Sequence, residues 1–210
     1  MKKLLLKFIL RLHTLIYSII GKLSVLCNKG VHPKHGLLRY YEFFLDNINE
    51  KDIVLDVGCG SGVVAEALAK KAKHITAVDM KEASVRKASF LSRSSNIEYL
   101  SADVTQYAFR RRFDVVMLSN VLEHISRRVE FLKKMAKISD KILVRVPMVD
   151  RDWLTLYKKQ LGMEYRLDKT HFIEYTLDSF KEEAGLAGLA VLNHYVRFGE
   201  LYAVLAKTGL

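Results

Sequence analysis

Residues 54–62 of this chain read VLDVGCGSG, from Val54 to Gly62. A short apolar run of the kind that forms a buried strand passes here into a glycine-rich turn, and a helical pattern follows. Glycine lets the backbone adopt positive φ and approach a ligand closely. The stretch therefore predicts a ligand site where a strand ends and a helix begins.

The spacing of the glycines narrows the choice of ligand. It reads Asp-x-Gly-x-Gly-x-Gly, whereas the dinucleotide fingerprint reads Gly-x-Gly-x-x-Gly. The stretch resembles the cofactor loop of class I S-adenosylmethionine-dependent methyltransferases, which implies S-adenosylmethionine as cofactor and Asp56 as the anchor of its methionine end. The loop residues implied to bind it are Gly58, Cys59, Gly60 and Gly62. The alternative is a glycine-rich turn that binds nothing.

The rest of the chain alternates strand and helix patterns. Short β-branched runs are predicted as strands at Ile53–Val57, Ile75–Asp79, Ile97–Ser101, Val115–Ser119 and Ile142–Pro147. Helices are predicted at 62–73, 81–92, 121–138 and Leu177–Ala184, and Leu189–Arg197 with Glu200–Lys207 form a C-terminal antiparallel hairpin. Such alternation predicts an α/β, doubly wound, Rossmann-like sheet. With the hairpin it matches the seven-stranded methyltransferase sheet.

Two further acids follow strands in the same register. Asp79 ends the second strand, where a carboxylate can accept two hydrogen bonds from a ribose diol. Asp103 follows the third strand, where the resembled family contacts the adenine amino group. Taken alone, an acid at position 103 is more often a helix N-cap than a ligand, but its register with Asp56 and Asp79 favours a ligand. The neighbouring Met80 and Val104 are assigned to the cofactor site with them.

The fourth strand leads into the segment where the resembled family places the sulfonium and the acceptor. Ser119 and Asn120 are assigned to the cofactor there, and His124 is a candidate general base because a neutral imidazole accepts a proton near neutral pH. The alternative for His124 is the family's acid-histidine pair with a structural role. His171 is a candidate acceptor-side residue, and its alternative is a loop histidine before a helix capped by Thr176 and Ser179.

The bulk properties indicate one domain with an appendage. The chain has 210 residues, half of them hydrophobic, and two cysteines, Cys27 and Cys59, without metal-ligand spacing. We therefore predict no metal site and a cytoplasmic protein. Near-neutral charge in the core domain and the lack of an Asn-Pro-Pro-aromatic motif after the fourth strand argue against a nucleic-acid substrate.

The net charge of +11 is concentrated at the N-terminus. Residues 1–41 carry eight basic residues and no acidic one, and the remaining 26 basic and 23 acidic residues give only +3. Residues 1–32 are thus predicted as a basic amphipathic arm and residues 33–210 as the methyltransferase domain, with a turn near Gly30 and Pro33. The arm is expected to form one helix from Lys2 to Leu26, and residues 34–47 a second.

The first helix has a broad apolar face and a basic stripe. That pattern is typical of a helix lying in a membrane interface, neither cleaved nor spanning the bilayer, so residues 1–26 are predicted to make peripheral contact with the inner face of the membrane. A helix packed on the domain or on a second subunit fits equally well. The pattern does not decide the oligomeric state.

The predicted function is methyl transfer from S-adenosylmethionine to a small-molecule, lipid-linked or glycan acceptor, mainly by alignment of the two reactants. Amphiphilic acceptors suit the predicted membrane contact. The alternatives are an RNA or protein methyltransferase, and a non-catalytic adaptor that keeps the fold. A nicotinamide oxidoreductase is excluded by the glycine spacing and the C-terminal hairpin.

Overall fold

A computed structural model describes residues 1–29 and 32–208 of the chain. They form two compact units, Met1–Tyr40 and Tyr41–Leu210, and each is described by itself. The division predicted between residues 32 and 33 stays a prediction. The turn predicted near Gly30 lies outside the described residues.

The first unit consists of two helices. Helix α1 spans Lys2–Cys27, as predicted to within one residue, and α2 spans Lys34–Leu38. Within the described residues α1 is the one helix long and apolar enough to cross a membrane by length and composition, with a mean hydropathy of 1.6. Such a test does not separate a spanning helix from an interfacial one, so the interfacial orientation stays a prediction.

The single helix predicted over 34–47 is wrong. Helix α2 stops at Leu38, because Arg39 adopts a left-handed backbone conformation with φ of 46°. A new helix, α3, then begins the second unit at Tyr41–Asp46 and buries Phe43 and Phe44. A residue in the left-handed conformation ends a helix even where the apolar side chains keep a helical spacing. The hydrophobic periodicity of residues 34–47 therefore predicted one helix where there are two.

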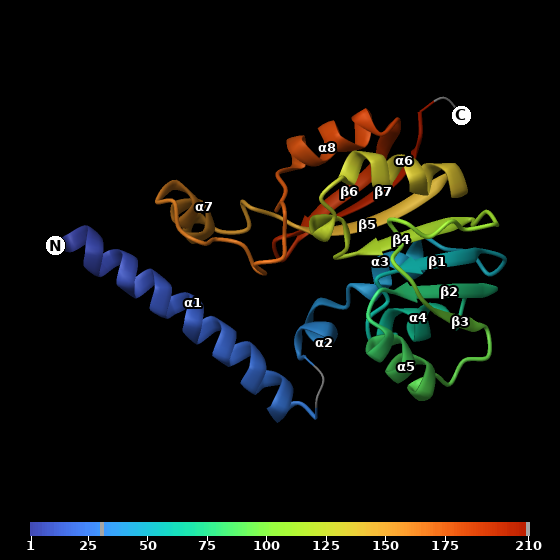
Figure 1. The fold of residues 1–210 in the computed structure, drawn as a ribbon, viewed down its shortest axis with the longest axis horizontal. Coiled ribbons are helices and arrows are strands. Elements are labelled where there is room, and N and C mark those ends of the chain that lie inside the picture. The colour runs from blue at the N-terminus through green and yellow to red at the C-terminus, as the bar shows by residue number, and fades with distance from the viewer. Residues whose placement is uncertain (30–31, 209–210) are drawn as a thin grey trace. The chain divides into compact units, whose positions relative to one another are not determined.

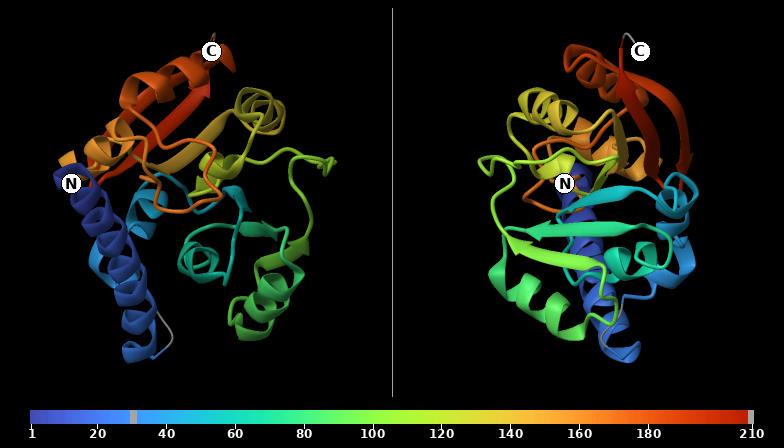
Figure 2. Two further views of the ribbon diagram at one scale, coloured as in Figure 1. Left: turned by 60° about the vertical axis from the view of Figure 1, so that its left-hand side comes forward. Right: turned by 90° about the vertical axis from the view of Figure 1, so that its right-hand side faces the viewer.

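The second unit is built on a seven-stranded sheet in the order β3-β2-β1-β4-β5-β7-β6 (Figures 1 and 2). Five strands are parallel and β7 pairs antiparallel with β5 and β6. The bounds are β1 Ile53–Val57, β2 His74–Asp79, β3 Ile97–Ser101, β4 Val115–Ser119, β5 Lys141–Pro147, β6 Leu189–Arg197 and β7 Glu200–Lys207. The predicted fold class and hairpin are confirmed.

The strand order reverses direction between β1 and β4. From β1 the chain proceeds outward through helix α4 (Val63–Leu68) and helix α5 (Glu82–Leu91), and on the other side β4 continues through α6 (Arg128–Ile138) to β5. Right-handed crossovers place helices of the two directions on opposite faces of the sheet. Open α/β sheets bind their ligands outside the carboxyl ends of the strands at such a reversal, which here lies between β1 and β4.

Three helices after β4 can be compared with the sequence prediction, and two of them differ from it. The helix predicted over 121–138 is interrupted: a single 3₁₀ turn, η1, spans Leu122–His124, and Ile125 is extended before α6 begins. Helix α7, Trp153–Gln160, was not predicted, although Asp152 caps it by accepting from the Thr155 amide. Helix α8, Leu177–Leu186, begins with the predicted Thr176 and Ser179 in a capping box.

Candidate functional site

The loop after β1 is shaped by three glycines in left-handed backbone conformations. Gly58, Gly60 and Gly62 have φ of 71°, 54° and 76°, a region that other residues rarely adopt. The amides of Gly58 and Cys59 donate to the carbonyl oxygen of Val78 at 2.7 and 3.0 Å. The loop is therefore fastened to the end of the neighbouring strand β2.

The three glycines differ in what a side chain would meet. A Cβ on Gly58 would lie 2.6 Å from Cγ2 of Val121, and one on Gly62 would lie 2.7 Å from Oη of Tyr99. On Gly60 it would have no heavy atom of the described residues within 4 Å. Packing thus requires glycine at 58 and 62, whereas the space beside Gly60 is open to a ligand.

Asp79 connects this loop to the end of β2. Its Oδ2 accepts from the Gly60 amide at 2.9 Å, and its Oδ1 accepts from the Lys81 amide at 2.8 Å. The side chain is partly exposed, and the next residue, Met80, is exposed. Since each carboxylate oxygen has a second acceptor position, Asp79 can also accept hydrogen bonds from a ligand at this edge.

Asp56 is a buried acid without a complete set of partners. It is 2 % exposed, and its Oδ2 has no hydrogen-bond partner among the described residues. Burial, and secondarily the negative charge of Asp79, raise the pKa of Asp56 to about 8. Burial also raises the pKa of Cys59, which keeps that thiol neutral. The floor of the loop thus lacks a cation for the Asp56 carboxylate.

Asp103 forms a turn rather than a helix N-cap. Its Oδ1 accepts from the amide and the hydroxyl of Thr105 at 2.9 and 2.7 Å, and its Oδ2 accepts from Nε2 of Gln106 at 3.1 Å. These hydrogen bonds, from Thr105 first, hold the pKa of Asp103 below its ordinary value. Val104 is buried beside it. Contact between these residues and a cofactor stays a prediction.

The segment after β4 is positioned by Asn120, which has a left-handed φ of 55°. The Asn120 amide donates to the Arg145 carbonyl at 2.9 Å, and Arg145 Nε donates to Asn120 Oδ1 at 3.1 Å. This turn lies between β4 and η1, immediately after Ser119. The Val121 side chain that follows it lies beside the glycine loop, 2.6 Å from the position of a Cβ on Gly58.

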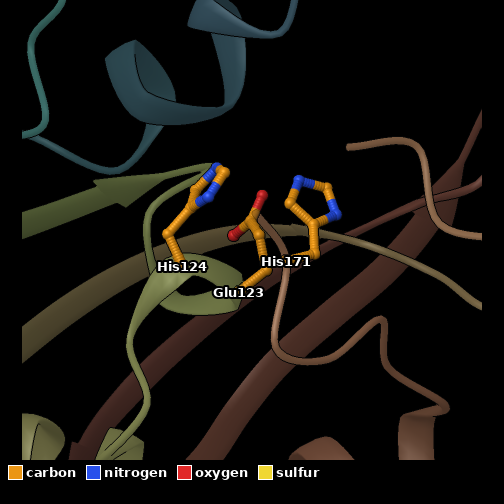
Figure 3. A group of neighbouring side chains, drawn as sticks. All are labelled: Glu123, His124 and His171. Atoms are coloured by element: carbon orange, nitrogen blue, oxygen red, sulfur yellow. The ribbon is translucent and has the colours of Figure 1, made fainter. Parts of the chain in front are cut away.

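Three side chains from η1 and from the segment before α8 meet beside this edge: Glu123, His124 and His171 (Figure 3). One potential ligand atom from each lies within 4.8 Å of the others. The two imidazole rings meet edge to face, with centroids 4.7 Å apart. The Phe172 amide donates to the Glu123 carbonyl at 2.8 Å, which fixes the second segment against the first.

The hydrogen bonds of His124 assign its proton. Its Nδ1 lies 2.9 Å from the hydroxyl of Thr170, which itself donates to Asp168 Oδ1 at 2.8 Å. A hydroxyl has one proton, so His124 Nδ1–H donates to Thr170 and Nε2 carries the lone pair. Desolvation, and then the neighbouring His171, lower the pKa of His124. The ring is therefore neutral near pH 7.

His171 is also oriented by a hydrogen bond from its Nδ1 atom, in this case to Glu174. It is buried, and its Nδ1 lies 3.1 Å from Oε1 of Glu174. Burial opposes the charge of Glu174, yet hydrogen bonds from His171, Leu167 and Arg151 hold the pKa of that carboxyl below its ordinary value. Glu174 accepts the Nδ1 proton, so the Nε2 edge of the His171 ring is the one left for other contacts.

Glu123 lies fully buried, and the sequence analysis did not select it. Neither carboxylate oxygen has a hydrogen-bond partner among the described residues. Burial raises the pKa of Glu123 to about 7. A pocket of about 510 Å³ opens next to the cluster and is lined by Thr105, Gln106, His124, Arg127 and Lys134 among others.

The predicted site residues thus fall into two groups. Asp56, the loop glycines and Asp79 are interlocked at the ends of β1 and β2. His124 and His171 are in ring contact although they are distant in sequence. Their common neighbour Glu123, and the orienting residues Thr170 and Glu174, were missed because only the tertiary structure brings them together.

Comparison with known proteins agrees with this arrangement. Residues 54–141 match a family model described as a methyltransferase domain. A protein of Bradyrhizobium diazoefficiens named ubiquinone biosynthesis O-methyltransferase is 31% identical over 117 residues, which make up 54% of this chain and 46% of that protein. The chain therefore spans less than half the length of this curated relative.

Solved structures extend the likeness of the fold. A magnesium protoporphyrin IX methyltransferase from Synechocystis, solved with bound SAH, has a TM-score of 0.65 at 17% identity and covers 82% of this chain and 84% of its own. An S-adenosylmethionine-dependent methyltransferase from Clostridium acetobutylicum has a TM-score of 0.67 at 13% identity and covers 92% and 100%. At such identities the likeness concerns the fold alone.

The glycine loop, the strand order and the family match agree with one another. Residues 54–141 therefore carry the likeness to methyltransferase domains, and the fold is that of the class I S-adenosylmethionine-dependent methyltransferases, as the sequence predicted. Within that class, the matched curated relative is an O-methyltransferase by name.

The two roles of glycine in the loop predict different effects on stability. Gly62→Ala places a methyl group 2.7 Å from Tyr99 Oη at a φ of 76°, and we expect a loss of about 2–3 kcal/mol in the free energy of unfolding. Gly60→Ala meets no neighbour and should lose only about 1–2 kcal/mol for its backbone conformation. Denaturant unfolding of both variants measures the difference.

The double variant Gly62→Ala/Tyr99→Phe provides the control. Removing the hydroxyl leaves Ala88 Cβ at 3.1 Å and Tyr99 Cε1 at 3.3 Å from the added carbon, so part, but not all, of the lost stability should return. Equal losses in Gly60→Ala and Gly62→Ala, with no recovery in the double variant, would contradict the packing role of Gly62.

Proposed function

We propose that this chain transfers a methyl group from S-adenosylmethionine to an oxygen of a small-molecule acceptor. The observation that carries the proposal is the loop from Asp56 to Gly62, with open space at Gly60 and an unpartnered buried carboxyl oxygen on Asp56. The match of residues 54–141 to a methyltransferase domain model and the name of the Bradyrhizobium relative support it.

The residues present fit the cofactor. The Asp56 carboxylate lacks a cation that an amino-acid ammonium group would supply, and Asp79 has acceptor positions for the two ribose hydroxyls. Met80, Asp103 and Val104 would border the adenine at the ends of β2 and β3. Ser119 and Asn120 would border the methionine end. When bound, the cofactor supplies a methyl group on a sulfonium, a donor that needs little further activation.

The main task of the chain is then alignment of the acceptor with that methyl group. Holding two reactants in line can supply on the order of 7–11 kcal/mol of the barrier. A hydroxyl acceptor must also lose its proton, and the Glu123, His124 and His171 cluster offers proton-accepting atoms beside the same edge. Assistance with this proton adds a factor of about 10²–10⁴.

An amphiphilic acceptor fits the first unit of the chain. Helix α1 carries Lys2, Lys3, Lys7, Arg11 and Lys22 and no acid, and we propose that it holds the protein at an anionic membrane surface on the cytoplasmic side. Apolar burial and attraction to anionic headgroups act together on such a helix. A lipid-linked or quinone-like acceptor would then meet the site at the membrane surface.

Cofactor binding tests the proposal. We expect Asp79→Ala to weaken binding of S-adenosylhomocysteine at least about 30-fold, because two charge-assisted hydrogen bonds are lost. Gly60→Ala should weaken it by a similar factor, because a methyl group enters the open space beside the loop. Isothermal titration calorimetry gives the affinities, and circular dichroism checks the fold.

Asp150→Ala is a matched control, an acid-to-alanine change outside the proposed site. Methylation of hydroxylated quinone and catechol probes by the wild-type chain, followed by mass spectrometry, then tests the reaction itself. Unchanged affinity in a folded Asp79→Ala variant would remove the assignment of the ribose to that residue.

The raised pKa of Asp56 predicts a pH dependence of binding. With a pKa of about 8 in the free protein, the carboxyl is mostly protonated at pH 6 and must release a proton to meet an ammonium group. Affinity for S-adenosylhomocysteine should therefore rise up to about tenfold per pH unit from pH 6 and level off near pH 8.

Calorimetry in buffers of different ionisation enthalpy counts the released proton directly. In Asp56→Asn the residue cannot ionise, so the affinity should be lower and its rise with pH should disappear. The same slope in wild type and Asp56→Asn would assign the proton to another group.

Membrane attachment through α1 predicts salt-sensitive binding to anionic vesicles. We expect the full chain to co-sediment with vesicles that contain phosphatidylglycerol and only weakly with phosphatidylcholine alone. Lys3→Gln/Lys7→Gln should lose about 30-fold in partitioning at low salt, at about 1 kcal/mol for each lysine. Lys133→Gln/Lys137→Gln on exposed positions of α6 is the charge-matched control. Equal, negligible sedimentation with both vesicle types would exclude the membrane role.

A further inference from the structure

Glu123 makes no side-chain hydrogen bond to His124, to His171 or to any other described residue. The Nδ1 proton of His124 is given to Thr170, and that of His171 to Glu174. The Nε2 atom of each ring is therefore left for another contact, and Glu123 adds two oxygens without a hydrogen-bond partner among the described residues. A buried carboxylate flanked by two imidazole nitrogens in this way is stabilised by a cation between them.

Burial makes the requirement stronger. Glu123 is 0 % exposed and His171 is 6 % exposed, so water does not solvate the carboxylate as it would at the surface. A protonated Glu123 would not be satisfied either, because neither of its oxygens has a partner among the described residues. A hydrogen-bonded structural pair does not account for this acid.

We propose that Glu123, His124 and His171 bind a divalent transition-metal ion of the Zn²⁺ type. Two imidazoles and one carboxylate are a ligand set that binds Zn²⁺ with a position left open for another ligand. Both histidines have the outer hydrogen bonds that orient metal ligands: Thr170 and Asp168 behind His124, and Glu174 behind His171.

The three potential ligand atoms must move slightly closer together to bind one ion. Ligand atoms about 2.0–2.1 Å from one tetrahedral ion lie about 3.3 Å apart, and here they lie within 4.8 Å of one another. His124 is exposed and can rotate inward, whereas Glu123 and His171 are buried in place. Figure 3 shows the carboxylate and both rings directed toward the same space.

The proposal rests on the proposed methyl transfer and specifies how the acceptor loses its proton. The acceptor oxygen occupies the open position on the ion, where its pKa falls, and it releases its proton to solvent. That oxygen then bonds to the methyl carbon while the carbon–sulfur bond breaks and its electron pair stays on sulfur. The ion keeps its oxidation state, and the histidines remain ligands throughout.

The metal-free chain, prepared with a chelator, is titrated with Zn²⁺ by calorimetry and with Co²⁺ by visible absorption. We expect one ion for each chain and a Co²⁺ spectrum of a low-coordinate nitrogen and oxygen site. Glu123→Gln and His124→Gln should each weaken binding at least about 100-fold, and Thr170→Val about 10-fold by freeing the orientation of His124.

His74→Gln is the matched control, because His74 pairs with Glu98 on the sheet and should not affect the ion. The exposed His124 variant gives a readout even where Glu123→Gln fails to fold. S-adenosylhomocysteine affinity is measured on each preparation, so that loss of the metal site is distinguished from loss of the cofactor site.

Absence of Zn²⁺ and Co²⁺ binding in a chain that binds the cofactor and methylates an acceptor would overturn the metal proposal and leave the proposed function standing. Equal metal affinity in wild type, Glu123→Gln and His124→Gln would overturn it as well. Metal binding without cofactor binding would instead contradict the proposed function.

Discussion

The turn after β1 depends on a backbone that few residues other than glycine can adopt. Gly58, Gly60 and Gly62 all have positive φ, and this lets two loop amides bond to the last carbonyl of the buried part of β2 while a third bonds to Asp79. Strands β1 and β2 are thus joined at their ends as well as along their lengths. The site depends on this joint, because it fixes Asp56 and Asp79 relative to one another.

On either side of that joint lies a buried acid with at least one carboxyl oxygen that no described residue hydrogen-bonds. Asp56 lies below the glycine loop, and Glu123 lies beyond β4 between two histidines. Each unsatisfied buried polar group costs about 1–3 kcal/mol. Such a cost is typical of binding sites, where the partner is a ligand, and both acids would be relieved by a positive charge. The free energy thereby lost from folding is regained when that charge binds.

The sequence predicted the sheet well and the irregular segments poorly. Strands β1, β3 and β4 fall at their predicted residues because buried parallel strands read as compact apolar runs. The helices predicted over 34–47 and 121–138 were wrong. A left-handed residue at Arg39 and an extended one at Ile125 interrupt them, and hydrophobic periodicity does not reveal the φ and ψ of a single residue.

The glycine loop and Asp79 were predictable because they are local to strand ends. The cluster around Glu123 was not, because it joins segments that meet only in the folded chain.

The central claim is that the loop from Asp56 to Gly62 is a cofactor site at the junction of β1 and β4. A crystal structure of the chain grown with S-adenosylhomocysteine tests it most directly. We expect the ribose hydroxyls on Asp79, the amino group beside Asp56 and the sulfur directed toward the cluster of Glu123, His124 and His171. A ligand bound elsewhere, or bound at the loop with its ribose away from Asp79, would contradict it.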